Sequence, residues 1–190
     1  MPHAPALHRF IEQALAASRA HPEPSDAVLA IAPLMRELAC NAAGFLQPAH
    51  RRSDPAHYTR NLIHDAGDNS LSLYAIAWRP GQWTPVHDHG SWGVVGVIEG
   101  VLEERSYVRL TPDDGRDESI RLARGGVVLL PTGAVSTFVP NPDHIHVTGV
   151  AVDRPPVLSL HLYGRTMSHF NLYDAHAGTR RRIEVAHNES

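Results

Sequence analysis

From Tyr58 onward, the chain consists of short apolar runs separated by turn residues, and this pattern limits its fold more than any other feature. Valine, isoleucine, leucine, tyrosine and tryptophan fill the runs, and turn sequences such as 65–68 and 112–115 separate them. Roughly ten short strands with no helical pattern between them predict an all-β sandwich or barrel. The expected strands cover residues 58–64, 71–79, 92–98, 101–110, 118–122, 127–130, 135–139, 144–152, 157–163 and 181–186.

The first fifty residues follow a helical pattern instead. Apolar side chains recur at helical spacing in two segments, which a loop over 21–24 separates. Ser25 stands where it would cap the second helix. We expect one domain over residues 1–190, with a helical segment over 1–50 that covers a β-barrel over 56–186. The apolar residues of the two helices are Leu7, Phe10, Ile11, Leu15, Val28, Ile31, Leu34, Met35 and Leu38.

Charge and cysteine content exclude several kinds of partner. The formal net charge is −3, with both signs interspersed, so we expect neither nucleic acid nor a membrane as partner. The single cysteine, Cys40, excludes an intrachain disulfide and a thiolate metal cluster, and we expect it to be a small buried residue. The first residues lack a signal-peptide pattern and no apolar stretch reaches membrane-spanning length, so the expected compartment is the cytoplasm.

Histidine is the residue type that indicates a possible metal site, and the sequence has two His-x-His pairs among its 14 histidines. His87 and His89 are two residues apart, so on a strand their imidazoles share one face and can meet one ion. A solvent-facing pair on an edge strand would have the same spacing. Pro85 before the pair and Gly90 after it indicate a strand end or a sharp bend.

The second pair is His144 and His146, in a later expected strand. Either histidine could complete a three-histidine site that leaves coordination positions open, as catalytic metal sites do. Neutral imidazoles suit Fe(II), and also zinc, nickel or copper, and the spacing does not choose among these metals.

A row of polar side chains lies on the strand expected over 157–163. Ser159, His161 and Tyr163 alternate with leucines, so one face is apolar and the other carries a hydroxyl, an imidazole and a phenol. Such a row faces either solvent or a polar cavity, and inside a barrel all three groups need hydrogen-bond partners. We favour the cavity, because the leucine face needs its own apolar partner.

Together, these residues resemble the motifs of a known protein family. The run from Gly81 through His87, His89 and Gly93 to Gly100 resembles the first cupin motif, but most cupins carry a glutamate ligand where this chain has Gly93. The absence of this glutamate ligand is typical of the thiol dioxygenases of the cupin superfamily, and in this respect the chain resembles the bacterial cysteine dioxygenases. Further matches are the segment 58–62, the position of His146, and the Ser-x-His-x-Tyr run of residues 159–163. The resemblance covers roughly residues 25 to 170.

The resemblance implies a cupin double-stranded β-helix, or jelly-roll, barrel with an N-terminal helical cap. It also implies Fe(II) held by His87, His89 and His146, with Arg60 on the substrate carboxylate. Tyr163 would place its hydroxyl at the open side of the metal, with His161 and Ser159 orienting it. His144 would then stand behind the ligands.

Two departures from the family pattern bear on substrate and chemistry. Mammalian members carry, where this chain has Gly93, a cysteine cross-linked to the tyrosine, so Tyr163 is expected to be uncrosslinked. Relatives that favour 3-mercaptopropionate tend to have glutamine where this chain has Arg60. Arg165 could add a second cation for a dicarboxylate such as mercaptosuccinate, or be a solvated rim residue. Trp83 and Trp92 either wall the pocket or pack in the core or rim.

The implied activity is dioxygenation of the sulfur of a small thiol carboxylic acid to a sulfinate, with cysteine to cysteine sulfinic acid as the first expectation. The alternatives within this class are 3-mercaptopropionate and mercaptosuccinate. An isomerase, a carbon dioxygenase, or a non-enzymatic metal-binding cupin sensor are alternatives of other classes. The expected partners are the thiol and dioxygen, and the protein is expected to be a monomer or a small homo-oligomer.

Overall fold

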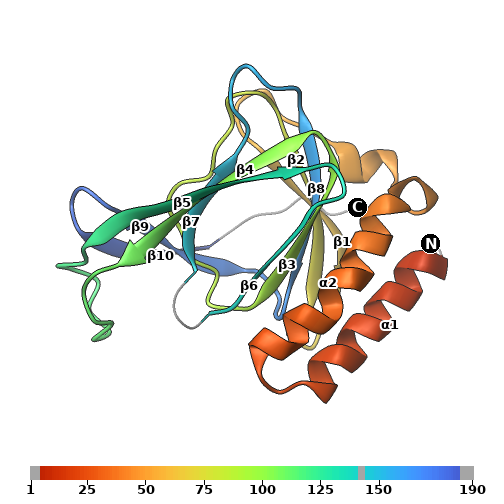
Figure 1. Ribbon diagram of the computed structural model, residues 1–190, viewed down its shortest axis with the longest axis horizontal. Helices are drawn as coiled ribbons and strands as arrows, with labels where there is room; N and C mark the ends of the chain where they lie inside the picture. The colour runs from red at the N-terminus through yellow and green to blue at the C-terminus, as the bar shows by residue number, and fades with distance from the viewer. Residues whose placement is uncertain (1–4, 141–143, 185–190) are drawn as a thin grey trace.

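A computed structural model describes residues 5–140 and 144–184 (Figure 1). Two α-helices and two short 3-10 helices come first, and ten strands follow. The helical elements are α1 (Pro5–Ala20), α2 (Pro24–Cys40), η1 (Ala42–Gly44) and η2 (Pro48–Arg51). The strands are β1 (Thr59–Asp65), β2 (Ser72–Trp78), β3 (Gly93–Glu99), β4 (Val101–Arg109), β5 (Leu122–Pro131), β6 (Val135–Phe138), β7 (Ile145–Gly149), β8 (Val157–Tyr163), β9 (His169–Asp174) and β10 (Thr179–Glu184).

The strands form two facing antiparallel layers, as in a jelly-roll barrel (Figure 1). One layer is a five-stranded sheet with the order β1-β2-β8-β3-β6. The other contains the sheet β5-β4-β7 and the hairpin β10-β9. Residues 83–87 join these two parts, because Trp83 pairs with Gly149, and His87 pairs with both His146 and Leu172.

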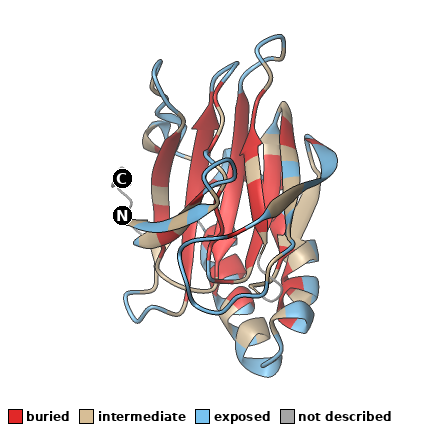
Figure 2. Cartoon of the chain, turned by 90° about the vertical axis from the view of Figure 1, so that its left-hand side faces the viewer, coloured by how far each residue is buried: buried red, intermediate tan, exposed pale blue. Residues whose placement is uncertain are grey.

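The helices cover the outer face of the five-stranded sheet, which explains why β2 and β8 are buried along their whole length (Figure 2). Leu158, Leu160 and Leu162 of β8 belong to the core that packs under the helices. Ile31 and Met35 of α2 are fully buried in the same core, and each such burial contributes about 1.5–3 kcal/mol. The other face of β8 is turned to the barrel interior.

Gly96 of β3 lies directly under α2. A Cβ at this position would lie 2.9 Å from Met35 Cγ, so the methionine side chain occupies the space above the glycine. This contact fixes the depth at which the helix packs on the strand.

The fold class predicted from the sequence is confirmed: an all-β cupin-like barrel with an N-terminal helical cap. Most strand predictions agree with the structure to within a residue or two at the N-terminal end of each strand. One was wrong, because residues 118–121 of the strand expected over 118–122 lie outside any strand. The strand expected over 127–130 is present but too short, because it is part of the longer β5, which runs through Gly125 and Gly126. A side chain at 125 would collide with Ser106, so glycine there allows β5 to stay paired with β4.

Three further expectations need correction or comment. Ser25 does not cap α2, because the helix starts one residue earlier at Pro24 with Glu23 as N-cap. Pro24 is preorganised for the first helical turn, where its missing N–H costs nothing. Cys40 is exposed at the end of α2 rather than buried. β9 was not predicted at all, and residues 185–186 of the last expected strand lie outside the described part of the chain.

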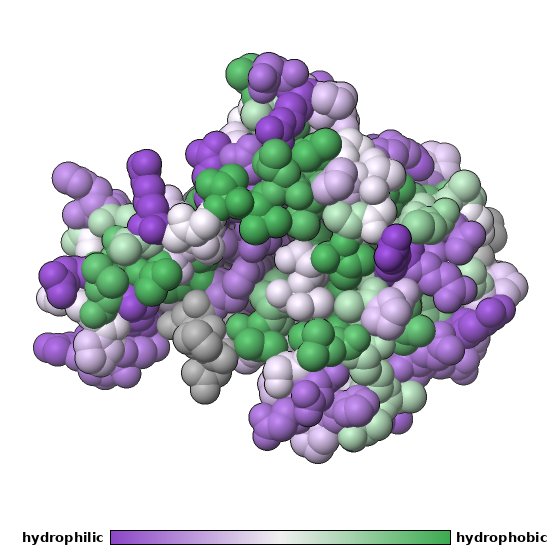
Figure 3. Space-filling model, viewed as in Figure 1, coloured by the Kyte–Doolittle hydropathy of each residue, from purple (hydrophilic) through white to green (hydrophobic). Residues whose placement is uncertain are grey.

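The surface is mixed in polarity. Figure 3 shows apolar residues gathered over the middle of one face and polar residues over most of its periphery. Among the helices that the structure describes, none is both long and apolar enough to span a bilayer.

Candidate metal centre

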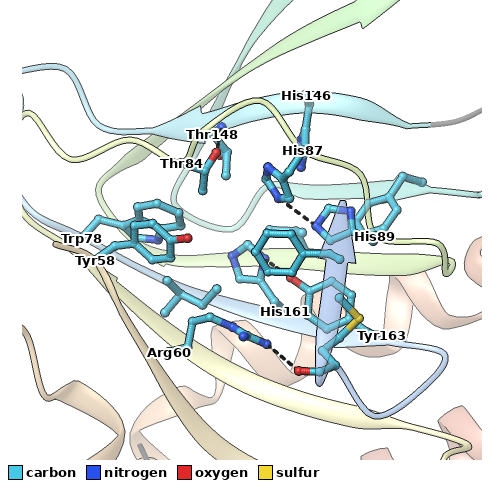
Figure 4. Close-up of a pocket in the computed structure, with 15 residues that line it drawn as sticks. Tyr58, Arg60, Trp78, Thr84, His87, His89, His146, Thr148, His161 and Tyr163 are labelled. Carbon is cyan, nitrogen blue, oxygen red and sulfur yellow. Dashed lines mark hydrogen bonds between the residues drawn. The ribbon is translucent and has the colours of Figure 1, made fainter. Parts of the chain in front are cut away.

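Three histidines converge inside the barrel. The ligating nitrogens of His87, His89 and His146 all lie within 4.8 Å of one another, and each side chain is 5% exposed or less. His87 Nε2 and His89 Nε2 are 3.2 Å apart. In Figure 4 the three imidazoles approach one side of the cavity together. The structure thus brings together one complete His-x-His pair and one member of the second pair.

Backbone pairing places His87 beside His146. His87 N donates to the His146 carbonyl and His146 N donates to the His87 carbonyl, both at 2.9 Å. Directly opposite residues in an antiparallel pair point to the same face, so both imidazoles enter the barrel. His87 and His89 lie in the irregular segment between β2 and β3 rather than on a regular strand, next to the bend that Pro85 and Gly90 predicted.

β9 holds this segment from the other side. Asp88 lies between the two histidines, is buried, and accepts hydrogen bonds from the Tyr173 hydroxyl at 2.6 Å and from Asn171 Nδ2 at 3.0 Å. The backbone of Tyr173 also donates to the Val86 carbonyl. These bonds fix the backbone from which His87 and His89 project.

The environment keeps the three imidazoles neutral, which is the form that binds metals. Burial lowers the pKa of His87, His89 and His146, with mutual repulsion among them adding to the effect at the first two. His87 Nδ1 donates to the Pro85 carbonyl at 3.1 Å, which leaves the lone pair on Nε2. His146 Nε2 is buried with no hydrogen-bond partner among the described residues. An ion bound by three imidazoles satisfies these atoms, so the residues fit a metal.

Arg60 of β1 lies across the cavity from the histidines (Figure 4). It is 8% exposed, and its guanidinium lies over the Tyr74 ring, 4.6 Å from the centroid. Nη2 donates weakly to the Met167 carbonyl at 3.4 Å, and Nη1 has no hydrogen-bond partner in the described chain. No carboxylate is among the described residues that line the cavity, so Arg60 is the only permanent charge there.

Ser159, His161 and Tyr163 of β8 form one chain of hydrogen bonds on the cavity side. Ser159 Oγ lies 2.9 Å from His161 Nε2, and the Tyr163 hydroxyl lies 3.5 Å from His161 Nδ1. All three side chains are buried, so the solvent-facing alternative for this row is wrong. Burial lowers the pKa of His161 to about 3 and raises the pKa of Tyr163 well above its usual value.

Trp78 extends this chain, and sequence reasoning missed it. Its indole Nε1 donates to Ser159 Oγ at 3.0 Å, and its ring stacks on Tyr58 at 4.7 Å. Trp78 lines the cavity, whereas the structure does not place Trp83 or Trp92 in its lining. The signal was available in the alternation of β2, because Trp78 has the same parity as Tyr74 and Ile76.

Arg165 lies outside the cavity lining. Its Nη2 donates to the His89 carbonyl at 2.9 Å and to the His169 carbonyl at 2.6 Å, and Nη1 lies 2.7 Å from His169 Nε2. Substrate contact by Arg165 stays a prediction, and these bonds favour instead a role in holding the backbone of His89.

Phe138 explains why position 93 is glycine. Gly93 pairs with both Phe138 and Tyr163, and a Cβ on it would collide with Phe138 Cζ. The phenyl ring therefore occupies the space that a side chain at 93 would need, beside the tyrosine. Phe138 also stacks on His89 with a centroid distance of 4.6 Å.

In addition to Asp88, a second carboxylate lies next to the three histidines, and the sequence analysis did not identify it. Glu104 of β4 contacts His144 Nε2 at 3.1 Å and His146 Nδ1 at 3.5 Å. Burial opposes ionisation of this carboxyl, but the two imidazoles outweigh it and hold its pKa well below the usual value. His144 thus stands outside the three-histidine group, as the resemblance implied.

Three inward-facing histidines that could hold one metal ion lie inside an antiparallel two-layer barrel, which is the fold of the cupin class. Among solved structures, the chain is similar to a conserved protein with a double-stranded β-helix domain from Klebsiella pneumoniae, at 17% identity over 66% of this chain and 91% of that one, with a TM-score of 0.48. It is also similar to a cupin-like protein from Thermotoga maritima, at 14% identity over 69% and 82%, with a TM-score of 0.42.

A sequence model of the cysteine dioxygenase type I family matches residues 23–176, and the chain belongs to that family. The match includes both helix α2 and the whole barrel up to β9. Membership identifies the protein, in general terms, as a thiol dioxygenase of a metal-dependent family.

Proposed function

We propose that this cavity binds a small thiol monocarboxylic acid and adds both atoms of dioxygen to its sulfur, with cysteine converted to cysteine sulfinic acid. The observation that carries the proposal is the placement of one buried, under-bonded arginine opposite three neutral histidines. A carboxylate on Arg60 and a thiolate at the histidines would span such a cavity.

His87, His89 and His146 would hold the metal, which we propose is iron. A bound ferrous ion would supply the one-electron chemistry that lets dioxygen react with a thiolate, and would lower the pKa of the thiol. The protein supplies the geometry and a cavity lined mostly by buried residues, including Ile76, Val95 and Phe138.

Arg60 would bind the substrate carboxylate. A guanidinium makes two parallel charge-assisted hydrogen bonds to a carboxylate, and Nη1 has no competing partner among the residues described. Burial strengthens this pairing, because few waters remain to screen it. The substrate is thereby oriented with its sulfur toward the histidines.

The polar chain on β8 would orient the Tyr163 proton. Trp78 Nε1 can only donate, so Ser159 Oγ accepts from it and can donate its own proton to His161 Nε2. Neutral His161 then carries its proton on Nδ1 and donates to the Tyr163 oxygen. This leaves the phenol O–H free to donate into the cavity, where it would stabilise negative charge that develops on oxygen.

The proposed reaction balances without another reactant. Two S–O bonds form and the O–O bond breaks. The sulfur loses four electrons and dioxygen gains four, so no external reductant is needed. The thiol proton is released to solvent, because the sulfinic acid product is ionised at neutral pH.

The cavity charge also bears on the alternatives. Mercaptosuccinate has two carboxylates, but among the described lining residues only Arg60 carries a positive charge at neutral pH, and Arg165 is engaged elsewhere. This favours a monocarboxylate such as cysteine or 3-mercaptopropionate. The presence of arginine rather than glutamine at position 60 favours cysteine of these two.

Oxygen uptake by iron-loaded protein tests the proposal. We expect uptake with cysteine, less with 3-mercaptopropionate and mercaptosuccinate, and little with cysteamine, which lacks the carboxylate. Product analysis should find one sulfinate per dioxygen. Iron-loaded protein that binds these thiols but consumes no oxygen would instead support a metal-binding sensor.

A further inference from the structure

We propose that Glu104, anchored by His144, is a positioning residue for the metal centre: it orients His146 and increases the electron density that this imidazole donates. The inference rests on the proposed metal site at His87, His89 and His146. It goes further by assigning a task to two residues outside that group.

The geometry places a carboxylate directly behind one ligand. Glu104 lies on β4, next to β7, and its Oε2 is 3.5 Å from His146 Nδ1. His146 Nε2 is the other ring nitrogen, and it belongs on the metal side if Nδ1 faces the carboxylate. Glu104 is 12% exposed as a side chain, so solvent screens this contact little.

His144 anchors the carboxylate. Its Nε2 lies 3.1 Å from Glu104 Oε1, so the two carboxylate oxygens each face one imidazole. Within the described part of the chain, no arginine or lysine ion-pairs with Glu104. The negative charge is therefore available to the histidine it stands behind.

A stack of three rings fixes the anchor in turn. The His144 ring lies parallel to Phe138, with centroids 4.7 Å apart and an interplanar angle of 5°. The Phe138 ring stacks on His89 at 4.6 Å. We call His144, Phe138 and His89 the ring stack. It ties the position of Glu104 to the position of a second ligand, His89.

A carboxylate behind a ligating histidine fixes the ring orientation and the tautomer and makes the imidazole a stronger donor. A stronger donor binds a metal cation more tightly and favours the higher oxidation state of iron. Loss of the charge should therefore weaken metal binding and raise the reduction potential of the centre.

The experiment compares Glu104→Gln with a matched control, Glu103→Gln. Glu103 is the neighbouring residue on β4, and its side chain is 10% exposed against 12% for Glu104, but it pairs with Arg105 at 2.8 Å and points away from the histidines. Both variants lose one negative charge of similar exposure from the same strand. Unfolding midpoints of the metal-free proteins verify that each variant folds.

The readouts are Co(II) and Fe(II) affinity by chelator competition, without thiol, and the reduction potential of the iron-loaded protein. We expect Glu104→Gln to bind either metal roughly 10- to 100-fold more weakly and to shift the potential upward. Glu103→Gln should match the wild type. His144→Phe keeps the ring stack but removes the N–H donor, and should give a smaller change in the same direction.

Wild-type affinity and potential in Glu104→Gln would overturn the inference. So would a second equivalent of metal that Glu104→Gln abolishes, because Glu104, His144 and His146 would then be ligands of another ion. Wild-type protein that binds no metal would refute the proposed site itself. Protein that binds metal but does not oxidise thiols would refute the proposed activity and leave this inference intact.

Discussion

Arg60 carries the substrate assignment at the scale of single residues. Replacing it with alanine removes the only permanent positive charge among the described residues that line the cavity. It also removes the two parallel N–H donors of the guanidinium. Hydrogen bonds to charged groups contribute about 1.5–3 kcal/mol, so we expect KM for cysteine to rise roughly 10- to 100-fold. Steady-state oxygen uptake measures KM, and metal analysis should show iron content near that of the wild type.

Cysteamine is the matched control for Arg60→Ala. Because it has no carboxylate, wild type and variant should oxidise it equally slowly. If Arg60→Ala retains the wild-type KM for cysteine, the carboxylate lies elsewhere and the assignment of Arg60 is wrong.

Tyr163 acts through its hydroxyl in the proposed mechanism. Tyr163→Phe keeps the ring, which contacts His89 with a centroid distance of 5.2 Å, and removes only the O–H. We expect turnover to fall roughly 100- to 1000-fold, as for the loss of one preorganised donor, while iron content is unchanged. Ser159→Ala should cause a smaller loss, since it affects only the proton position on His161. Equal loss of iron and turnover in Tyr163→Phe would contradict this role.

Sequence reasoning found the residues whose spacing carries the chemistry. His87 and His89 share a face because they are two residues apart, and the resemblance chose His146 over His144. Glu104 has no such signal, because its partner His146 is about 40 residues away. Alternation along β2 puts Trp78 on the cavity face, but its hydrogen bond to Ser159, about 80 residues away, could not be predicted from the sequence. A lone glutamate or tryptophan in a strand is indistinguishable from ordinary strand composition until the register is known.

At the scale of elements, the contact between β3 and β6 depends on glycine at position 93. Gly93→Ala forces the Phe138 ring to move, and overpacking of this kind costs about 1–3 kcal/mol. We expect a lower unfolding midpoint in urea and, because Phe138 stacks on His89, weaker metal binding as well.

Two further variants separate the causes. Gly126→Ala is the control, because it changes a strand glycine whose Cβ would meet no atom within 4 Å. Adding Phe138→Leu to Gly93→Ala should restore part of the stability by making room for the methyl group. If Gly93→Ala is as stable as Gly126→Ala, the phenyl ring does not fill that space.

Element prediction succeeded where apolar periodicity was local and failed where pairing was distant. β2, β3 and β8 are apolar runs that the sequence shows directly. β9 was missed because His169–Asp174 alternates imperfectly and follows a turn-rich segment. The missed strand is the one that holds Asp88 and the histidine segment, so the support of the site was invisible although its ligands were not.

At the scale of the whole molecule, buried neutral histidines predict how stability depends on pH. The pKa of His161 is about 3 in the folded protein, against 6.5 for an exposed imidazole, and those of His87, His89 and His146 are also lowered. Below 6.5 the unfolded chain binds protons that the folded chain does not. Stability is therefore fully present above that pH and falls as the pH decreases, by up to about 1.4 kcal/mol per pH unit for each such group.

Urea unfolding of the metal-free protein at pH 7.5, 6.5 and 5.5 measures this slope. His161→Gln should make the free energy of unfolding depend less steeply on pH between 6.5 and 5.5, because the unfolded chain of this variant takes up one proton fewer. A free energy of unfolding that is constant or increases as the pH falls over this range would contradict the burial of neutral imidazoles.

The whole fold was more predictable than the complete site. An N-terminal helical cap, a barrel and every strand except β9 follow from local patterns, because each of these strands needs only turns and alternating burial to form. The division into one domain over 1–190 and the oligomeric state stay predictions.

The fate of dioxygen tests the central claim most directly. Iron-loaded protein is supplied with cysteine under ¹⁸O₂ in ordinary water, and the product is analysed by mass spectrometry. If the cavity adds both oxygen atoms to the sulfur, the sulfinate carries two ¹⁸O atoms, and a variant lacking His87 yields none. A sulfinate labelled with one atom or none, or cystine as the only product, would contradict the account.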